Sequence, residues 1–102
     1  VEMRVTEMIT TIKVSGSNRK HRVLVYALST CAWCKMTKQF LNENNIEYEF
    51  VDVDSCDEED RNKIRNEITR RGGVPSYPTI IVDDKTLITG FRKGAIKEAL
   101  EI

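Results

Sequence analysis

The sequence His21-Arg22-Val23-Leu24-Val25-Tyr26-Ala27-Leu28 is followed, after two polar residues, by Cys31-Ala32-Trp33-Cys34. The apolar run has the length and composition of a buried strand, and the residues from Lys35 onward have the spacing of an amphipathic helix. The Cys-x-x-Cys pair therefore lies at a strand-to-helix junction, with the first thiol at the helix N-terminus. Unpaired backbone N–H groups and the helix dipole favour a thiolate there. The second thiol is one turn further on, so the pair is suited to exchanging two electrons with another disulfide.

Length and composition are consistent with such a protein. The chain of 102 residues has room for one domain with a modest core. Its formal net charge at pH 7 is zero, which gives no reason to expect a nucleic acid as partner. No segment is apolar for the length of a membrane span, and no signal peptide is recognisable. The three cysteines make an odd set, unlike a secreted disulfide scaffold, so we expect a reducing compartment, the cytoplasm.

The first half of the chain predicts an extension followed by a strand, a helix and a second strand. Residues 1–20 are read as an N-terminal extension with one possible extra strand, since Met8, Thr10, Ile12 and Val14 form a weak alternating pattern. The domain proper spans residues 21–102 and begins with a strand over residues 21–27. The helix after the Cys-x-x-Cys pair is expected to end at Asn44-Asn45, and the second strand to cover residues 47–52. The apolar face expected for this helix consists of Trp33, Met36, Phe40 and Leu41.

The second half predicts a polar helix, a hairpin and a last helix. Ser55 with Glu58 three residues later fits a capping box, and Gly72-Gly73 supplies the stop. Two strands over residues 79–82 and 86–89 are joined by a tight turn, and a helix follows from about Lys93. Its expected buried residues are Ala95, Ile96, Ala99 and Leu100. The order β-α-β-α-β-β-α predicts a right-handed parallel βαβ unit extended by an antiparallel hairpin, which makes a four-stranded mixed sheet in an α/β fold.

A zinc site is the main alternative reading of the two spaced cysteines, with Cys56 and His21 as further ligands. His21 and Cys31 lie at opposite ends of one strand, which at about 3.3 Å per residue separates them by roughly 20 Å or more. We therefore predict no metal site. His21 is read as an exposed residue at the strand start.

A second element, Ser76-Tyr77-Pro78-Thr79, stands directly before the third strand of the domain. Proline is tolerated at the opening of a strand because no ladder donor is lost there. An ordinary trans-proline loop is the simpler reading, and position alone leaves the isomer of Pro78 open.

Together, residues 26–34 and the segment Tyr77-Pro78-Thr79-Ile80-Ile81-Val82 resemble the thioredoxin superfamily, and within it the glutaredoxins, over residues 21–102. The resemblance implies a thioredoxin-like fold with Cys31 as the exposed nucleophile and Cys34 as the buried resolving thiol. It also implies that Pro78 is a cis-proline facing the dithiol and that the Tyr77 backbone pairs with substrate. Trp33 either faces substrate or packs against its neighbours at the helix start.

The residues that would bind glutathione depart from the glutaredoxin pattern. Leu28 stands where many glutaredoxins have a Lys or Arg, and Gly90 stands alone where many have a Gly-Gly pair. The segment Thr89-Gly90-Phe91-Arg92 instead resembles the Ser-Gly-Phe-Arg of NrdH-type redoxins, which take electrons from a thioredoxin reductase. Gly90 is kept as a candidate substrate-binding residue.

These observations predict a monomeric dithiol–disulfide oxidoreductase that reduces protein disulfides through Cys31 and Cys34, without a bound cofactor. Its partners would be protein disulfides and a reductase, either thioredoxin reductase or the glutathione system, with glutathione as a possible co-substrate. An iron–sulfur carrier of the glutaredoxin type is the alternative, weakened by the same departures at Leu28 and Gly90. Cys56 follows the second strand at the same sheet edge as Cys31, so it is either an additional redox thiol or an ordinary residue at a helix start.

Overall fold

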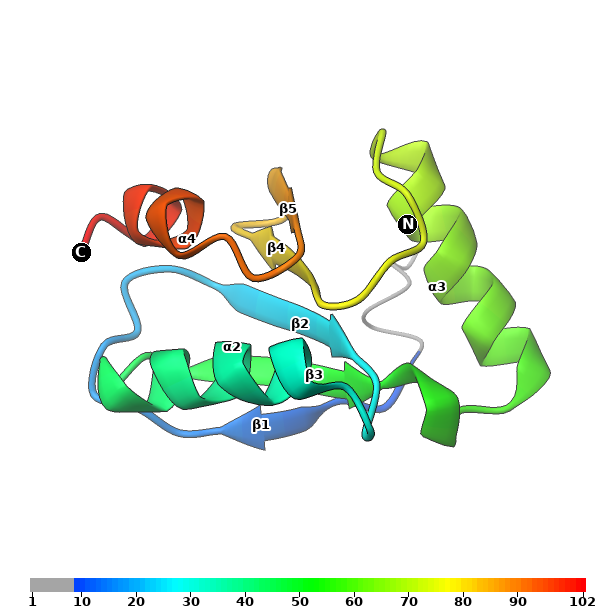
Figure 1. Cartoon of the computed structure of the whole chain (residues 1–102), viewed down its shortest axis with the longest axis horizontal. Coiled ribbons are helices and arrows are strands. Elements are labelled where there is room, and N and C mark those ends of the chain that lie inside the picture. The colour runs from blue at the N-terminus through cyan, green and yellow to red at the C-terminus, as the bar shows by residue number, and fades with distance from the viewer. Residues whose placement is uncertain (1–8) are drawn as a thin grey trace, which may run out of the picture.

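The computed structural model describes residues 9–102, which form a mixed sheet of five strands with helices on both faces (Figure 1). The strands lie in the order β1-β3-β2-β4-β5. Their bounds are β1 Ile12–Val14, β2 Val23–Ala27, β3 Tyr48–Asp52, β4 Thr79–Val82 and β5 Thr86–Thr89. The helices are α2 Ala32–Glu43, the short 3-10 helix η1 Val53–Ser55, α3 Glu58–Arg70 and α4 Lys93–Leu100.

The central strand β2 is buried along its whole length and fixes the direction of its neighbours. It pairs in parallel with β3, with Ala27 opposite Asp52, and antiparallel with β4. Because the carboxyl ends of parallel strands meet at one edge, the loop after β2 and the turn after β3 emerge side by side (Figure 1). The Cys-x-x-Cys pair begins at this edge of the sheet.

The alternation of side chains along the strands divides the apolar interior into two layers. Val23, Val25 and Ala27 face one layer, in which residues of α2 and α4 are packed. Leu24 and Tyr26 face the other layer, which α3 covers. The sheet is therefore sandwiched between α2 and α4 on one side and α3 on the other.

The extra strand expected in the N-terminal extension is present as β1, which pairs antiparallel with β3. The sheet thus has five strands, one more than the four expected for the domain proper. The contact continues beyond β1. Gly16 lies against the backbone of residues 45–47, and Asn18 forms an isolated β-bridge with Ile46, next to the start of β3. The expected alternation reaches back to Met8, which lies outside the described residues.

Helix α2 ends at the expected Asn44-Asn45, with Asn45 at a positive φ of 57°. The predicted apolar face is wrong for two of its four residues. Trp33 and Met36 are 59% and 44% exposed, while the helix buries Cys34, Thr37, Phe40 and Leu41. Each helical residue turns the chain by about 100°. Trp33 and Met36, one position before Cys34 and Thr37, therefore lie beside the buried face and not on it.

The predicted capping box of helix α3 is wrong, because the helix is capped two residues later than Ser55. Asp57 is the N-cap, and its carboxylate accepts a hydrogen bond from the Asp60 N–H at 2.8 Å. Ser55 belongs to η1, the turn that carries the chain out of β3, so it is not available as a helix cap. The helix ends as expected before Gly72, whose φ is +86°.

The hairpin and the last helix follow the prediction. Asp83 and Asp84 both have positive φ, as the central residues of a type I′ turn require. In α4, Ile96 and Leu100 are buried, and Ala95 and Ala99 pack against the same layer while remaining partly exposed. Within residues 9–102, no helix is both long enough and apolar enough to cross a membrane.

Candidate active site

Cys31 occupies the N-cap position of α2. Its Sγ accepts a hydrogen bond from the backbone N–H of Cys34 at 3.2 Å, and its carbonyl accepts the N–H of Lys35 at 3.1 Å. An N-cap side chain normally satisfies one of the free N–H groups of the first turn, and here a sulfur atom does so. All three cysteines are free thiols, with Cys31 partly exposed and Cys34 buried.

Cys34 is held as a neutral thiol. Burial, and next its hydrogen bond with Cys31, raises the pKa of the Cys34 thiol to about 12. The two thiols therefore have different environments, one at the surface facing free N–H groups and one inside the apolar layer. Such an asymmetric pair suits a reaction in which one sulfur attacks first and the other follows.

Tyr77 and Pro78 lie against the first thiol. The Tyr77–Pro78 peptide bond is cis, as the resemblance implies. The Tyr77 carbonyl oxygen is 3.9 Å from Cys31 Sγ, within reach of the thiol proton, and Pro78 is fully buried. The Gly90 N–H donates to the Pro78 carbonyl at 2.7 Å. Gly90 therefore supports this loop through its backbone, and its role toward a substrate stays a prediction.

Trp33 joins an aromatic series beside the thiols. Its ring centroid lies 6.4 Å from that of Phe91, which in turn lies 6.0 Å from Phe40 in the core. The indole therefore packs against a neighbour and still exposes more than half of its surface. Phe91 was not singled out from the sequence, and its position after Gly90 in the loop that turns into α4 is what brings it there.

Two further contacts at this sheet edge were also missed. The Ser29 N–H and hydroxyl both donate to the carboxylate of Asp54 in η1. Lys38 on α2 forms an ion pair with Asp52 at 3.2 Å and lies 3.8 Å from the centre of the Phe50 ring. The available signal was the parallel pairing of β2 with β3, which brings the residues after both strands to one edge.

The hydrogen bonds from Ser29, first from its hydroxyl and then from its N–H, hold the pKa of Asp54 below its ordinary value. Asp54 is exposed to solvent, so above the acidic range it carries a full negative charge. Leu28, just before Ser29, packs against the apolar layer under α3 and presents no charge to the site.

Cys56 follows η1 at the same sheet edge, as expected. Its Sγ donates to the Asp52 carbonyl at 3.7 Å and is only partly exposed. Burial, and next the nearby carboxylate of Asp60, raises the pKa of the Cys56 thiol. These surroundings disfavour a thiolate at Cys56.

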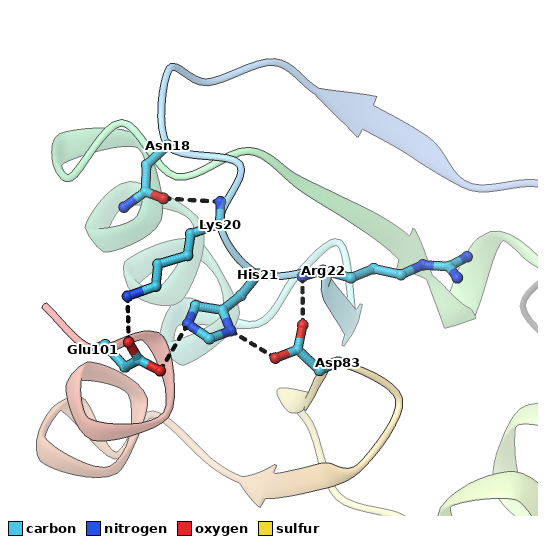
Figure 2. Close-up of polar contacts among 6 residues, drawn as sticks. All are labelled: Asn18, Lys20, His21, Arg22, Asp83 and Glu101. Atoms are coloured by element: carbon cyan, nitrogen blue, oxygen red, sulfur yellow. Dashed lines mark hydrogen bonds and ion pairs between the residues drawn. The ribbon is translucent and has the colours of Figure 1, made fainter.

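His21 lies at the far end of β2 and is not the exposed residue that we expected. Its side chain is only 13% exposed, because the β4–β5 turn and the end of α4 close over it. Figure 2 shows the ring between Asp83, 2.6 Å from Nδ1, and Glu101, 3.5 Å from Nε2. In the part of the chain that the structure describes, no three His, Cys, Asp or Glu side chains are grouped to hold a metal ion.

Comparisons with known proteins agree with this geometry. A family profile described as Glutaredoxin matches residues 23–87. The chain is 34% identical over 79 residues to an uncharacterized glutaredoxin-like 8.6 kDa protein in a rubredoxin operon of Clostridium pasteurianum, covering 78% of this chain and 97% of that protein. It is 33% identical over 64 residues to glutaredoxin 1 of Rickettsia conorii, covering 63% of this chain and 60% of the relative. The crystal structure of a glutaredoxin from Methanosarcina mazei Go1 superposes with a TM-score of 0.82 at 34% identity, covering 90% of this chain and 88% of the other.

Proposed function

The chain belongs to the glutaredoxin family, a family of thiol–disulfide oxidoreductases, and we propose that Cys31 is its nucleophile and Cys34 its resolving thiol. The observation that carries this assignment is the difference between the two sulfurs. Cys31 Sγ is partly exposed and accepts a helix N–H, whereas Cys34 is buried and held as a thiol. Attack on an external disulfide requires an accessible sulfur, and only the first one is accessible.

The reaction has two exchange steps. The Cys31 thiolate attacks one sulfur of a substrate disulfide, forms a mixed disulfide and releases the other substrate sulfur as a thiolate. Cys34 then gives up its proton and attacks the Cys31 sulfur, which releases the second substrate thiol and leaves a Cys31–Cys34 disulfide. Two electrons have passed to the substrate. The Tyr77 backbone beside Cys31 offers the substrate chain an edge to pair with.

For the return of electrons, we propose a protein reductase of the thioredoxin reductase type in preference to glutathione. Leu28 supports this choice, because it packs against the apolar layer under α3 and offers no charge at the position where many glutaredoxins have a Lys or Arg for a glutathione carboxylate. Gly90 stands alone where the glutathione-dependent pattern has a glycine pair, and its backbone N–H already donates to the Pro78 carbonyl.

The assignment of the sulfurs is tested by turnover of a protein disulfide with dithiothreitol as the electron source. We expect Cys31→Ser to abolish turnover and Cys56→Ser to leave it unchanged. Full activity of Cys31→Ser would overturn the assignment. The source of electrons is tested by offering the oxidised protein thioredoxin reductase with NADPH, or glutathione with its own reductase. We expect reduction by the first system, and efficient reduction only by the second would refute the proposal on the reductant.

A further inference from the structure

The loop between β2 and the nucleophile is short and is held by a single carboxylate. Only Leu28, Ser29 and Thr30 separate β2 from Cys31, and the Cys31 N–H donates to the Leu28 carbonyl at 3.2 Å. The middle residue, Ser29, gives both of its donors to Asp54. Its backbone N–H lies 2.9 Å from Asp54 Oδ1, and its hydroxyl bonds to Oδ2. Both Asp54 oxygens thus act on the residue two positions before the nucleophile.

Asp54 is itself fixed from two sides. It is the middle residue of η1, whose turn is closed by the Cys56 N–H donating to the Val53 carbonyl at 3.1 Å. At the start of the same turn, the Asp52 carboxylate pairs with Lys38 of α2. The Asp54 oxygens are therefore held by a turn that is tied to the sheet and to the helix that Cys31 caps.

The chemistry of the contact favours a carboxylate. The two bonds end on different Asp54 oxygens, and an ionised carboxylate offers both as acceptors, whereas an amide in the same place has one oxygen acceptor and an NH2 group that only donates. Hydrogen bonds to a charged acceptor are also stronger than those between neutral groups. The hydrogen bonds from Ser29, mainly that of its hydroxyl, lower the pKa of Asp54 and so favour its charged form.

We propose that Asp54 is a positioning residue for thiol exchange, which rests on the assignment of Cys31 as nucleophile. By holding Ser29, its carboxylate fixes the start of α2 at the point where Cys31 Sγ meets the Cys34 N–H. Loss of this hold lets the loop move and weakens the contact between sulfur and helix N-terminus that favours the thiolate.

If Asp54 positions the loop, replacing it should change the reactivity of the Cys31 thiol in the opposite direction to the change that loss of its negative charge alone would cause. Removing a negative charge near a thiol favours the thiolate and so lowers the pKa of the thiol. Releasing Ser29 takes stabilising N–H groups away from the sulfur and so raises that pKa. Asp54→Asn does both, and we expect the positioning effect to prevail.

The test measures alkylation of Cys31 by iodoacetamide from acid to alkaline pH, with Cys56→Ser as the parent so that Cys31 is the one accessible thiol. We compare Asp54→Asn with Asp60→Asn, which removes a carboxylate near residue 56 that makes no bond to Ser29. Since helix N-terminal effects correspond to about 0.3–1 kcal/mol, Asp54→Asn should raise the pKa of Cys31 by a few tenths of a unit and slow alkylation at neutral pH by about two- to fivefold. Asp60→Asn should leave the pKa unchanged or lower it.

A second variant keeps the test independent of folding. Ser29→Ala removes the hydroxyl donor and should shift the pKa in the same direction, and the double variant should be no worse than Asp54→Asn because both act through one contact. An unchanged or lowered Cys31 pKa in folded Asp54→Asn, or in Ser29→Ala if Asp54→Asn does not fold, would overturn the inference. A loss of stability with an unchanged pH profile would show a structural role only and would also overturn it. If Cys31 of the parent reacts no faster than the thiol of the unfolded chain, the proposed function itself fails.

Discussion

Gly16→Ala should destabilise the fold without touching the chemistry of Cys31. A methyl group at Gly16 would lie 2.5 Å from the Asn45 carbonyl oxygen and 2.6 Å from the Glu47 nitrogen, both backbone atoms. Ordinary contact begins at 3.4 Å, so either the segment around Gly16 or the segment of residues 45–47 must move by several tenths of an ångström. The bonds at risk are those on either side, from the Asn18 N–H to the Asn45 carbonyl and from the Glu47 N–H to the Asn18 carbonyl, at 2.8 and 2.9 Å.

The magnitude follows from those two bonds. Each contributes about 1 kcal/mol net, and overpacking against a rigid neighbour costs about 1–3 kcal/mol, so we expect a loss of about 2 kcal/mol in the free energy of unfolding. For a domain of this size, that lowers Tm by about 8–16 °C. The rate of Cys31 alkylation should stay at the wild-type value, because residues 45–47 lie at the opposite edge of the sheet.

The assay is urea unfolding followed by circular dichroism, with Gly94→Ala as the matched control. Gly94 is an exposed residue of α4 with nothing within 4 Å of an added methyl, and alanine there should raise stability by up to about 1 kcal/mol. Equal stability of Gly16→Ala and the wild type would refute the view that the segment before residue 21 is packed as part of the domain. A large fall in Cys31 reactivity would refute the separation of this contact from the active site.

Two further predictions concern buried groups. The Tyr26 hydroxyl is buried without a hydrogen-bond partner in the described part of the chain, so Tyr26→Phe should raise the free energy of unfolding by about 1 kcal/mol, and a clear loss in urea unfolding would contradict this. The Cys34 thiol has a pKa raised from 9.0 to about 12, so between these values the unfolded chain has released a proton that the folded chain keeps. Stability of the reduced protein should therefore fall as pH rises from 9, with a shallower slope in Cys34→Ala; identical slopes in urea titrations would be inconsistent with a buried thiol.

Much of the fold was predictable because it depends on local periodicity. The run before Cys31 predicted the central strand, and the second strand, expected over residues 47–52, is found as β3 at Tyr48–Asp52. The sequence pattern was less informative about the burial of residues whose surroundings are set by tertiary contacts. Trp33 is apolar and helical, but whether it is buried depends on which side of α2 meets the sheet.

The residues of the site likewise fall into those recognisable from the local sequence and those that only the fold brings together. The Cys-x-x-Cys pair and the Tyr77-Pro78 segment are each a short stretch of consecutive residues, so the first could be found from its own residues and the second through the family resemblance. Ser29 and Asp54 are separated by 25 positions and meet only because β2 and β3 are parallel and in register. His21 was misplaced for the same reason, since Asp83 and Glu101 reach it from distant segments.

Trapping the mixed disulfide tests the central claim most directly. Cys34→Ser removes the resolving thiol, so a protein disulfide attacked by Cys31 should remain bound to it. Intact mass and peptide mapping should show one substrate chain per protein, linked through Cys31 and released by dithiothreitol. No adduct, or an adduct linked through Cys56, would contradict the assignment of Cys31 as the sulfur that attacks.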